Sequence, residues 1–141
     1  MKNIQWLFLL CVLLGFAGCN SNVAMSGKVT FSDDGSPLTV GTVIFKKGNL
    51  ISKGNLQPDG TFVIGSMSES DGLAPGTYQV YISGADKDVI PPGKDASYAY
   101  LVPLIDPKHS KPETSGLSVD VTKATKNFEL QVERYDPNKK R

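Results

Sequence analysis

Apolar side chains recur at every second position in several short segments of this chain, beginning near residue 25. A period of two places alternate side chains on one face of a β-strand. The clearest segment lies near the C-terminus, where Phe128, Leu130 and Val132 alternate with polar residues. The same period places these other residues on an inward face: Gly27, Val29, Phe31, Val43, Phe45, Phe62, Ile64, Tyr78, Val80, Ile82, Leu117, Val119 and Val121. Because strands with one polar face are typical of antiparallel sheets, the pattern favours a β-sandwich or barrel.

Turn-forming residue pairs separate the alternating segments. Four such pairs are present: Asp34-Gly35, Gly48-Asn49, Asp59-Gly60 and Pro75-Gly76. Glycine accepts a positive φ without steric cost, and proline presets the bend of a tight turn. No stretch beyond the first 18 residues shows a sustained helical period. The sequence therefore predicts one all-β domain of about seven strands over residues 24–134.

The long segment from Gly84 to Ser115 departs from this pattern. Five prolines interrupt it: Pro91, Pro92, Pro103, Pro107 and Pro112. Each proline removes a backbone donor that a central strand would need. We expect this segment to wrap the sandwich as a loop with one short edge strand around Tyr98–Val102. Because loops of this length are often functional, it is the candidate surface for a partner.

Two tyrosines in this segment form a possible binding loop. Tyr98 and Tyr100 occupy alternate positions, so on a strand they would share one face. Two exposed rings there would make an aromatic platform for carbohydrate. Tyrosines that cover a sheet edge for packing would give the same pattern, and we favour packing.

The first residues of the chain resemble a bacterial lipoprotein signal. Lys2 precedes an apolar run that ends at Phe16-Ala17-Gly18-Cys19. Small residues before a cysteine are typical of such a cleavage site, although an aliphatic residue is usual where Phe16 stands. The run is shorter than the roughly 20 apolar residues that span a bilayer, which argues against an uncleaved transmembrane helix. We therefore expect a signal peptide over residues 1–18 and a lipidated tether over residues 19–23.

The resemblance to lipoproteins implies that lipid chains on Cys19 attach the protein to a membrane. One acyl chain holds a protein only marginally, whereas two or more hold it stably. We therefore expect an exported protein of the cell envelope whose first partner is membrane lipid. Asn20 follows the modified cysteine, and this residue favours the outer membrane if the organism is Gram-negative.

Cysteine content indicates what stabilises the fold, and charge limits the expected partners. The chain has two cysteines; Cys11 would be lost with the leader and Cys19 would carry lipid, so the fold must depend on its hydrophobic core. The formal charge is +1, and loss of Lys2 would bring it to zero. Nucleic-acid binding needs a basic face, so nucleic acid is not an expected partner. The basic end of residues 135–141 is either a solvated tail or a contact for anionic lipid or polymer.

A family resemblance rests on four segments in order. They are Ser26-Gly27-Lys28-Val29-Thr30-Phe31, Gly41-Thr42-Val43-Ile44-Phe45, Asp59-Gly60-Thr61-Phe62 and Leu73-Ala74-Pro75-Gly76-Thr77-Tyr78-Gln79-Val80. The chain resembles the carboxypeptidase regulatory-like, or transthyretin-like, domains, and in particular small planctomycete-type envelope lipoproteins. This resemblance implies a Greek-key β-sandwich that serves as an add-on module or envelope protein rather than as a catalyst.

The turn motifs of this resemblance have physical roles. Asp59 and Gly60 are typical of a hairpin turn, and Pro75 and Gly76 of a tight turn. We expect the ring of Tyr78 to enter the core while its hydroxyl reaches a backbone partner.

The sequence contains few residues suited to catalysis or to metal binding. His109 is the one histidine, and no Gly-x-Ser-x-Gly motif accompanies it. Zinc requires three or four nitrogen or sulfur ligands, and the acidic turn Asp33-Asp34 does not match a twelve-residue calcium loop. We expect no catalytic residue, metal or cofactor. The expected function is structural support, or binding of an envelope protein or polysaccharide; the alternative is a carbohydrate-binding or small-ligand carrier module.

Overall fold

The computed structural model describes residues 22–23, 25–65, 72–123, 125 and 127–139. The leader and Cys19 lie outside these residues. The strands are β1 Met25–Phe31, β2 Thr42–Lys47, β3 Leu50–Asn55, β4 Thr61–Ile64, β5 Gly76–Ser83, β6 Asp86–Val89, β7 Tyr100–Pro103, β8 Leu117–Val121 and β9 Asn127–Val132. Two short 3-10 helices accompany them, η1 Ala96–Tyr98 and η2 Pro107–Ser110.

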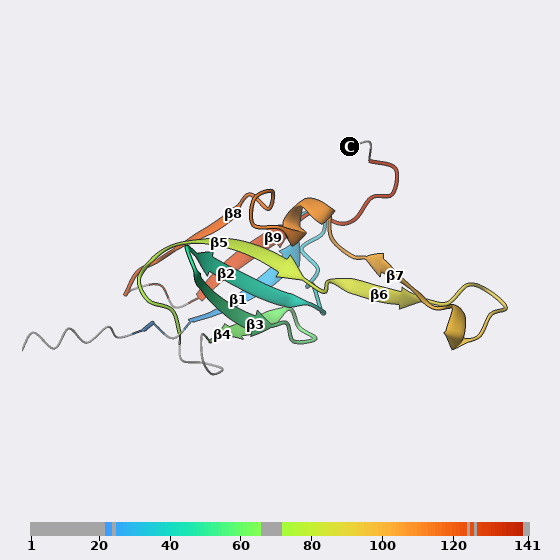
Figure 1. Ribbon diagram of the computed structural model, residues 1–141, viewed down its shortest axis with the longest axis horizontal. Coiled ribbons are helices and arrows are strands. Elements are labelled where there is room, and N and C mark those ends of the chain that lie inside the picture. The colour runs from blue at the N-terminus through green and yellow to red at the C-terminus, as the bar shows by residue number, and fades with distance from the viewer. Residues whose placement is uncertain (1–21, 24, 66–71, 124, 126, 140–141) are drawn as a thin grey trace, which may run out of the picture.

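Seven of the strands form two facing sheets. One sheet has the order β4-β1-β9 and the other the order β3-β2-β5-β8 (Figure 1). Strand β1 is the centre of the smaller sheet, antiparallel to β4 and parallel to β9. The chain changes sheet between β1 and β2, and again after β3, β4 and β8. The predicted all-β sandwich is therefore confirmed.

The core between the sheets follows the predicted alternation. Nearly all side chains expected on the inward faces are buried, and Leu117, Val119 and Phe128 are partly buried against the same cluster. Phe45 on β2 connects the two sheets, because its ring centroid lies 5.4 Å from that of Phe128 and 6.2 Å from that of Phe62. Such aromatic pairs stabilise a fold by about 0.5–1.5 kcal/mol beyond the area that they bury.

Two predicted turns are stabilised by specific contacts. In the turn before β4, the Asp59 carboxylate accepts hydrogen bonds from the Thr61 amide at 2.9 Å and the Thr61 hydroxyl at 2.6 Å, while Gly60 has a φ of 80°. Gly76, after Pro75, has a φ of 140°. Tyr78 is buried, and its hydroxyl donates to the Ala74 carbonyl at 2.9 Å.

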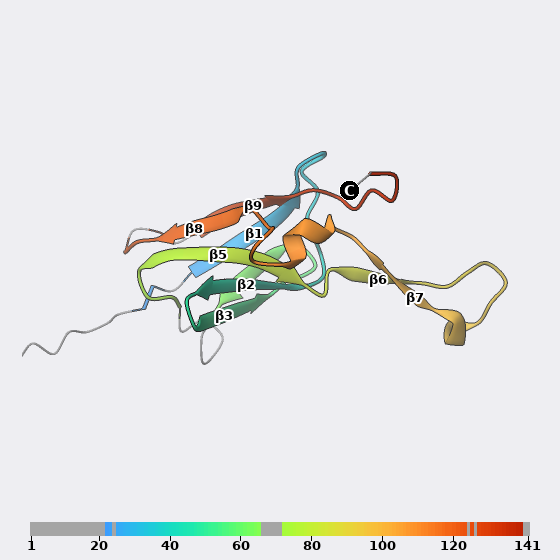
Figure 2. The same ribbon diagram turned by 45° about the horizontal axis from the view of Figure 1, so that its top comes forward.

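The segment from Gly84 to Ser115 follows the sandwich only in its second part, where Ile105, His109 and Ser115 are buried. For residues 86–103 the expectation that it wraps the sandwich is wrong. Strands β6 and β7 pair antiparallel and extend beyond the end of both sheets as a two-stranded ribbon (Figures 1 and 2). The predicted short strand overlaps β7. Pro91 and Pro92 lie between the strands and Pro103 ends β7, so the prolines limit the pairing without preventing it.

Candidate binding surfaces

The ribbon carries the largest group of exposed apolar side chains in the described part of the chain. Its members are Ile90, Tyr98, Tyr100 and Leu101, which are 49%, 56%, 53% and 66% exposed. We call these four residues the ribbon surface. Because successive side chains of a strand point to opposite faces, Tyr100 and Leu101 expose apolar surface on both faces of the ribbon.

The base of the ribbon is fixed to the sandwich, whereas its outer part stands free. Leu104 donates its amide to the Ala85 carbonyl at 2.8 Å, and Tyr135 donates to the Leu104 carbonyl at 3.0 Å. Ala85 and Ile105 are buried in the core. Beyond this base, no third strand pairs with β6 or β7 within the described residues. An isolated two-stranded hairpin is only marginally stable in water, so an additional contact would benefit the ribbon.

The tip of the ribbon is ordered by a cap on η1. Asp95 accepts hydrogen bonds from the Ser97 hydroxyl and, at 2.9 Å, from the Ser97 amide. These bonds lower the pKa of Asp95 below its usual value. The Lys94 ammonium lies 5.0 Å from the centroid of the Tyr98 ring. The tip therefore combines one cation, one anion and an aromatic ring.

Tyr98 and Tyr100 do not share a strand face in the way that their spacing suggests. Tyr98 belongs to η1, and the strand period begins only at Tyr100. Both rings are more than half exposed, so the interpretation that they pack over a sheet edge is wrong. They remain a pair of solvent-facing aromatic side chains on the ribbon.

His109 is a structural residue in this fold. Its ring is 4% exposed, Nδ1 lies 3.1 Å from the Ser115 carbonyl oxygen, and Nε2 accepts the Glu133 amide at 3.2 Å. Burial, with Lys108 nearby, lowers the pKa of His109. The nearby Ser115 hydroxyl donates to the Val80 carbonyl at 2.5 Å. With both ring nitrogens engaged by backbone groups, His109 has no nitrogen left to activate a nucleophile.

The acidic turn considered for calcium is occupied by an arginine. Arg134 donates to Asp33 and to Asp34, each at 2.9 Å, and its guanidinium lies 3.7 Å from the Phe31 ring centroid. Hydrogen bonds from Ser36, together with Arg134, lower the pKa of Asp34 to about 2. Over the described ranges, no group of three potential metal ligands is present.

The C-terminal tail is held against the domain. Lys139 pairs with Asp106 at 2.8 Å and with Glu133 at 2.6 Å, and Glu133 also pairs with Lys108. These contacts lower the pKa of Glu133 to about 2. Residues 136–139 are nevertheless exposed to solvent, and residues 140–141 lie outside the described part.

The cleavage motif Phe16, Ala17 and Gly18, together with Cys19, lies outside the described residues. Within those residues, no helix has the length and apolar character needed to cross a bilayer. No protein-family model, curated protein or solved structure matches the chain. The family resemblance and the lipid anchor therefore remain predictions from the sequence.

Proposed function

We propose that this protein is a non-enzymatic, lipid-anchored protein of the cell envelope, of the transthyretin-like kind, that presents its ribbon to a protein partner. The anchor is the lipidated Cys19 expected from the sequence. Two or more acyl chains on this residue would make membrane attachment durable.

The observation that carries this proposal is the position of the ribbon relative to the start of the domain. The described chain begins, in blue, at one end of the long axis, and the ribbon forms the opposite end (Figures 1 and 2). Val23 is joined to Leu73 at the first of these ends. Cys19 precedes Val23 by four residues, which span at most about 14 Å when extended. A lipid on Cys19 would therefore hold one end of the sandwich near the membrane and direct the ribbon away from it.

The shape and composition of the ribbon favour a protein partner over a small ligand. Small-molecule sites are concave, whereas the ribbon protrudes from the domain. Exposed tyrosine side chains such as Tyr98 and Tyr100 are enriched in protein interfaces. The free edges of β6 and β7 also permit an extended segment of a partner to add as a further strand.

Site-specific photocrosslinking in intact cells tests this proposal. A photoreactive residue replaces Leu101 on the ribbon, and in a matched control it replaces Leu50, which is 59% exposed at the start of β3. We expect a discrete crosslinked protein with the probe at 101 only, and we expect Tyr100→Asp to abolish it. Equal products from both positions, or none at 101, would refute the ribbon as the docking element.

A further inference from the structure

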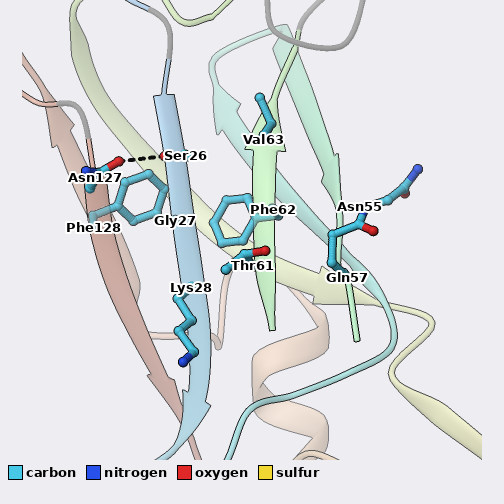
Figure 3. A pocket seen from close by; sticks show the side chains of 10 residues that line it. All are labelled: Ser26, Gly27, Lys28, Asn55, Gln57, Thr61, Phe62, Val63, Asn127 and Phe128. Carbon is cyan, nitrogen blue, oxygen red and sulfur yellow. Dashed lines mark hydrogen bonds between the residues drawn. The ribbon is translucent and has the colours of Figure 1, made fainter. Parts of the chain in front are cut away.

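A hollow of about 400 Å³ lies on the outer face of the smaller sheet, far from the ribbon. Its lining is shown in Figure 3 and consists of Ser26, Gly27, Lys28, Asn55, Gln57, Thr61, Phe62, Val63, Asn127 and Phe128. We call it the outer hollow. Its volume falls in the range of small-molecule sites, about 300–1,000 Å³.

The register of the strands brings the polar side chains of the outer hollow together. Ser26 on β1 is paired with Val63 on one side and with Asn127 on the other. Asn55 and Gln57 join from β3 and the turn after it, because the Lys53–Gly65 bridge and a 2.8 Å bond from the Gln57 amide to the Thr61 carbonyl hold that segment beside β4.

Gly27 lies in the floor of the outer hollow, and its missing side chain makes room for two aromatic rings on the core side of β1. A Cβ on Gly27 would lie 2.6 Å from Cζ of Phe62 and 3.0 Å from Cζ of Phe128. Without one, the two rings lie on either side of β1 (Figure 3), with centroids 5.5 Å apart. The base of the outer hollow is thus strand backbone above these core rings, and the rim is polar.

Two asparagines of the rim are oriented by their neighbours. Oδ1 of Asn127 accepts the Ser26 hydroxyl at 2.6 Å, and Oδ1 of Asn55 accepts the Thr42 hydroxyl at 3.0 Å. Each hydrogen bond engages Oδ1 and so orients the side-chain amide. The Nδ2 hydrogens of both asparagines can then bond to another acceptor. These two asparagines therefore offer hydrogen-bond donors at the rim of the outer hollow.

The charges around the outer hollow favour a neutral ligand. Lys28 is the one cation in its lining, and Glu129 is its register partner on β9. Hydrogen bonds from Thr61 lower the pKa of Asp59, and the charge of Lys28 adds a smaller contribution in the same direction. Because two carboxylates balance this lysine, an anionic ligand would gain little and would meet repulsion.

We propose that the outer hollow binds one residue of a neutral, N-acetylated saccharide. Such a sugar presents the carbonyl and hydroxyl oxygens that the asparagine Nδ2 groups need as acceptors. Its acetyl methyl group fits against Val63, which is 48% exposed. This inference goes beyond the ribbon proposal and does not depend on it, because neither the ribbon nor the anchor contributes to the outer hollow.

Saturation-transfer NMR on the full-length protein in detergent tests the proposal with three sugars. The probes are N-acetylglucosamine trimer, cellotriose without acetamido groups, and trigalacturonate with carboxylates. We expect the strongest transfer to the acetyl methyl of the first probe and at least tenfold weaker binding of the other two. Preference for cellotriose or trigalacturonate, or no transfer to the N-acetylated probe, would overturn the assignment.

Variants on two different strands locate the sugar. Asn127→Ala and Asn55→Ala should each weaken binding of the N-acetylated trimer at least fivefold. Gln79→Ala is the matched control, because it removes an exposed amide from β5 of the other sheet. Leu101→Asp on the ribbon should leave sugar binding unchanged, which separates this site from the docking proposal. Unaltered affinity in both asparagine variants, with the fold intact by circular dichroism, would place the sugar elsewhere and refute the proposal.

Discussion

At the residue scale, Tyr78 shows how one side chain combines burial with a polar contact. The ring is 2% exposed and packs against Phe45 with the centroids 6.3 Å apart. Its hydroxyl, at the edge of the core, is bonded to the Ala74 carbonyl just before the Pro75-Gly76 turn. The residue therefore ties the turn to the core.

Substitutions at Tyr78 should separate these two contributions. Tyr78→Ala removes a buried ring and should lower the free energy of unfolding by about 3–5 kcal/mol. Tyr78→Phe removes only the hydrogen bond and should cost about 1 kcal/mol. Tyr100→Ala is the control, because its ring is 53% exposed, and it should change stability by less than about 0.5 kcal/mol. Urea unfolding measures all three, and a loss with Tyr78→Ala no larger than with the control would contradict the burial of the ring.

His109 should make stability depend on pH. Its folded-state pKa is lowered, mainly by burial, so the unfolded chain takes up the proton first as the pH falls. The contribution of neutral His109 to stability is complete at pH values above the ordinary histidine pKa of about 6.5. It is lost progressively as the pH falls below this value. Protonation would also place a proton on Nε2, which now accepts the Glu133 amide.

We expect the urea midpoint to fall between pH 7.5 and pH 5.5. His109→Gln should be less stable at pH 7.5 and should show a much smaller change over the same range. Carboxylates titrate lower, and the pKa values of Asp34 and Glu133 are held at about 2, so they contribute little in this window. A wild-type midpoint that rises on acidification would contradict the neutral, buried state of His109.

At the element scale, the strands that alternate apolar and polar residues could be predicted, and two others could not. Strand β3 reverses the usual pattern, because Ser52 and Gly54 face inward while Leu50 and Ile51 are exposed. Strand β6 begins Asp86-Lys87-Asp88 and has no apolar period. Both are held by pairing with a neighbouring strand, which a pattern within one segment does not reveal.

Gly54 shows why β3 tolerates no larger side chain at its inward position. A Cβ there would lie 2.5 Å from the Val63 carbonyl oxygen and 3.0 Å from the Phe62 ring. Gly54→Ala should therefore destabilise the protein by about 1–3 kcal/mol through overpacking. Lys53→Ala, at the adjacent exposed position, should be nearly neutral. Thermal unfolding compares the two, and equal melting temperatures would show that β3 and β4 can separate at little cost.

At the scale of the whole molecule, both candidate binding surfaces depend on distant parts of the chain. The outer hollow draws its rim from four strands and a turn that span Ser26 to Asn127. The sequence contains these amides and hydroxyls, but only the register of β4, β1 and β9 shows that they meet. The sequence indicates the segment from Gly84 to Ser115 as a candidate surface for a partner. The projection of the ribbon from the domain depends on strand β6, whose sequence has no apolar period.

The proposed orientation of the whole molecule at a membrane depends on Cys19. Cys19→Ser removes the thiol that lipid chains would occupy, so the protein should lose palmitate labelling and either keep its leader or leave the detergent phase in a partitioning assay. Cys11→Ser provides a control within the same leader, because Cys11 would be discarded on cleavage, and this variant should behave as wild type. If both variants label and partition like wild type, the attachment is not through Cys19. The ribbon would then no longer be directed away from a membrane, even though the sandwich and the outer hollow would be unchanged.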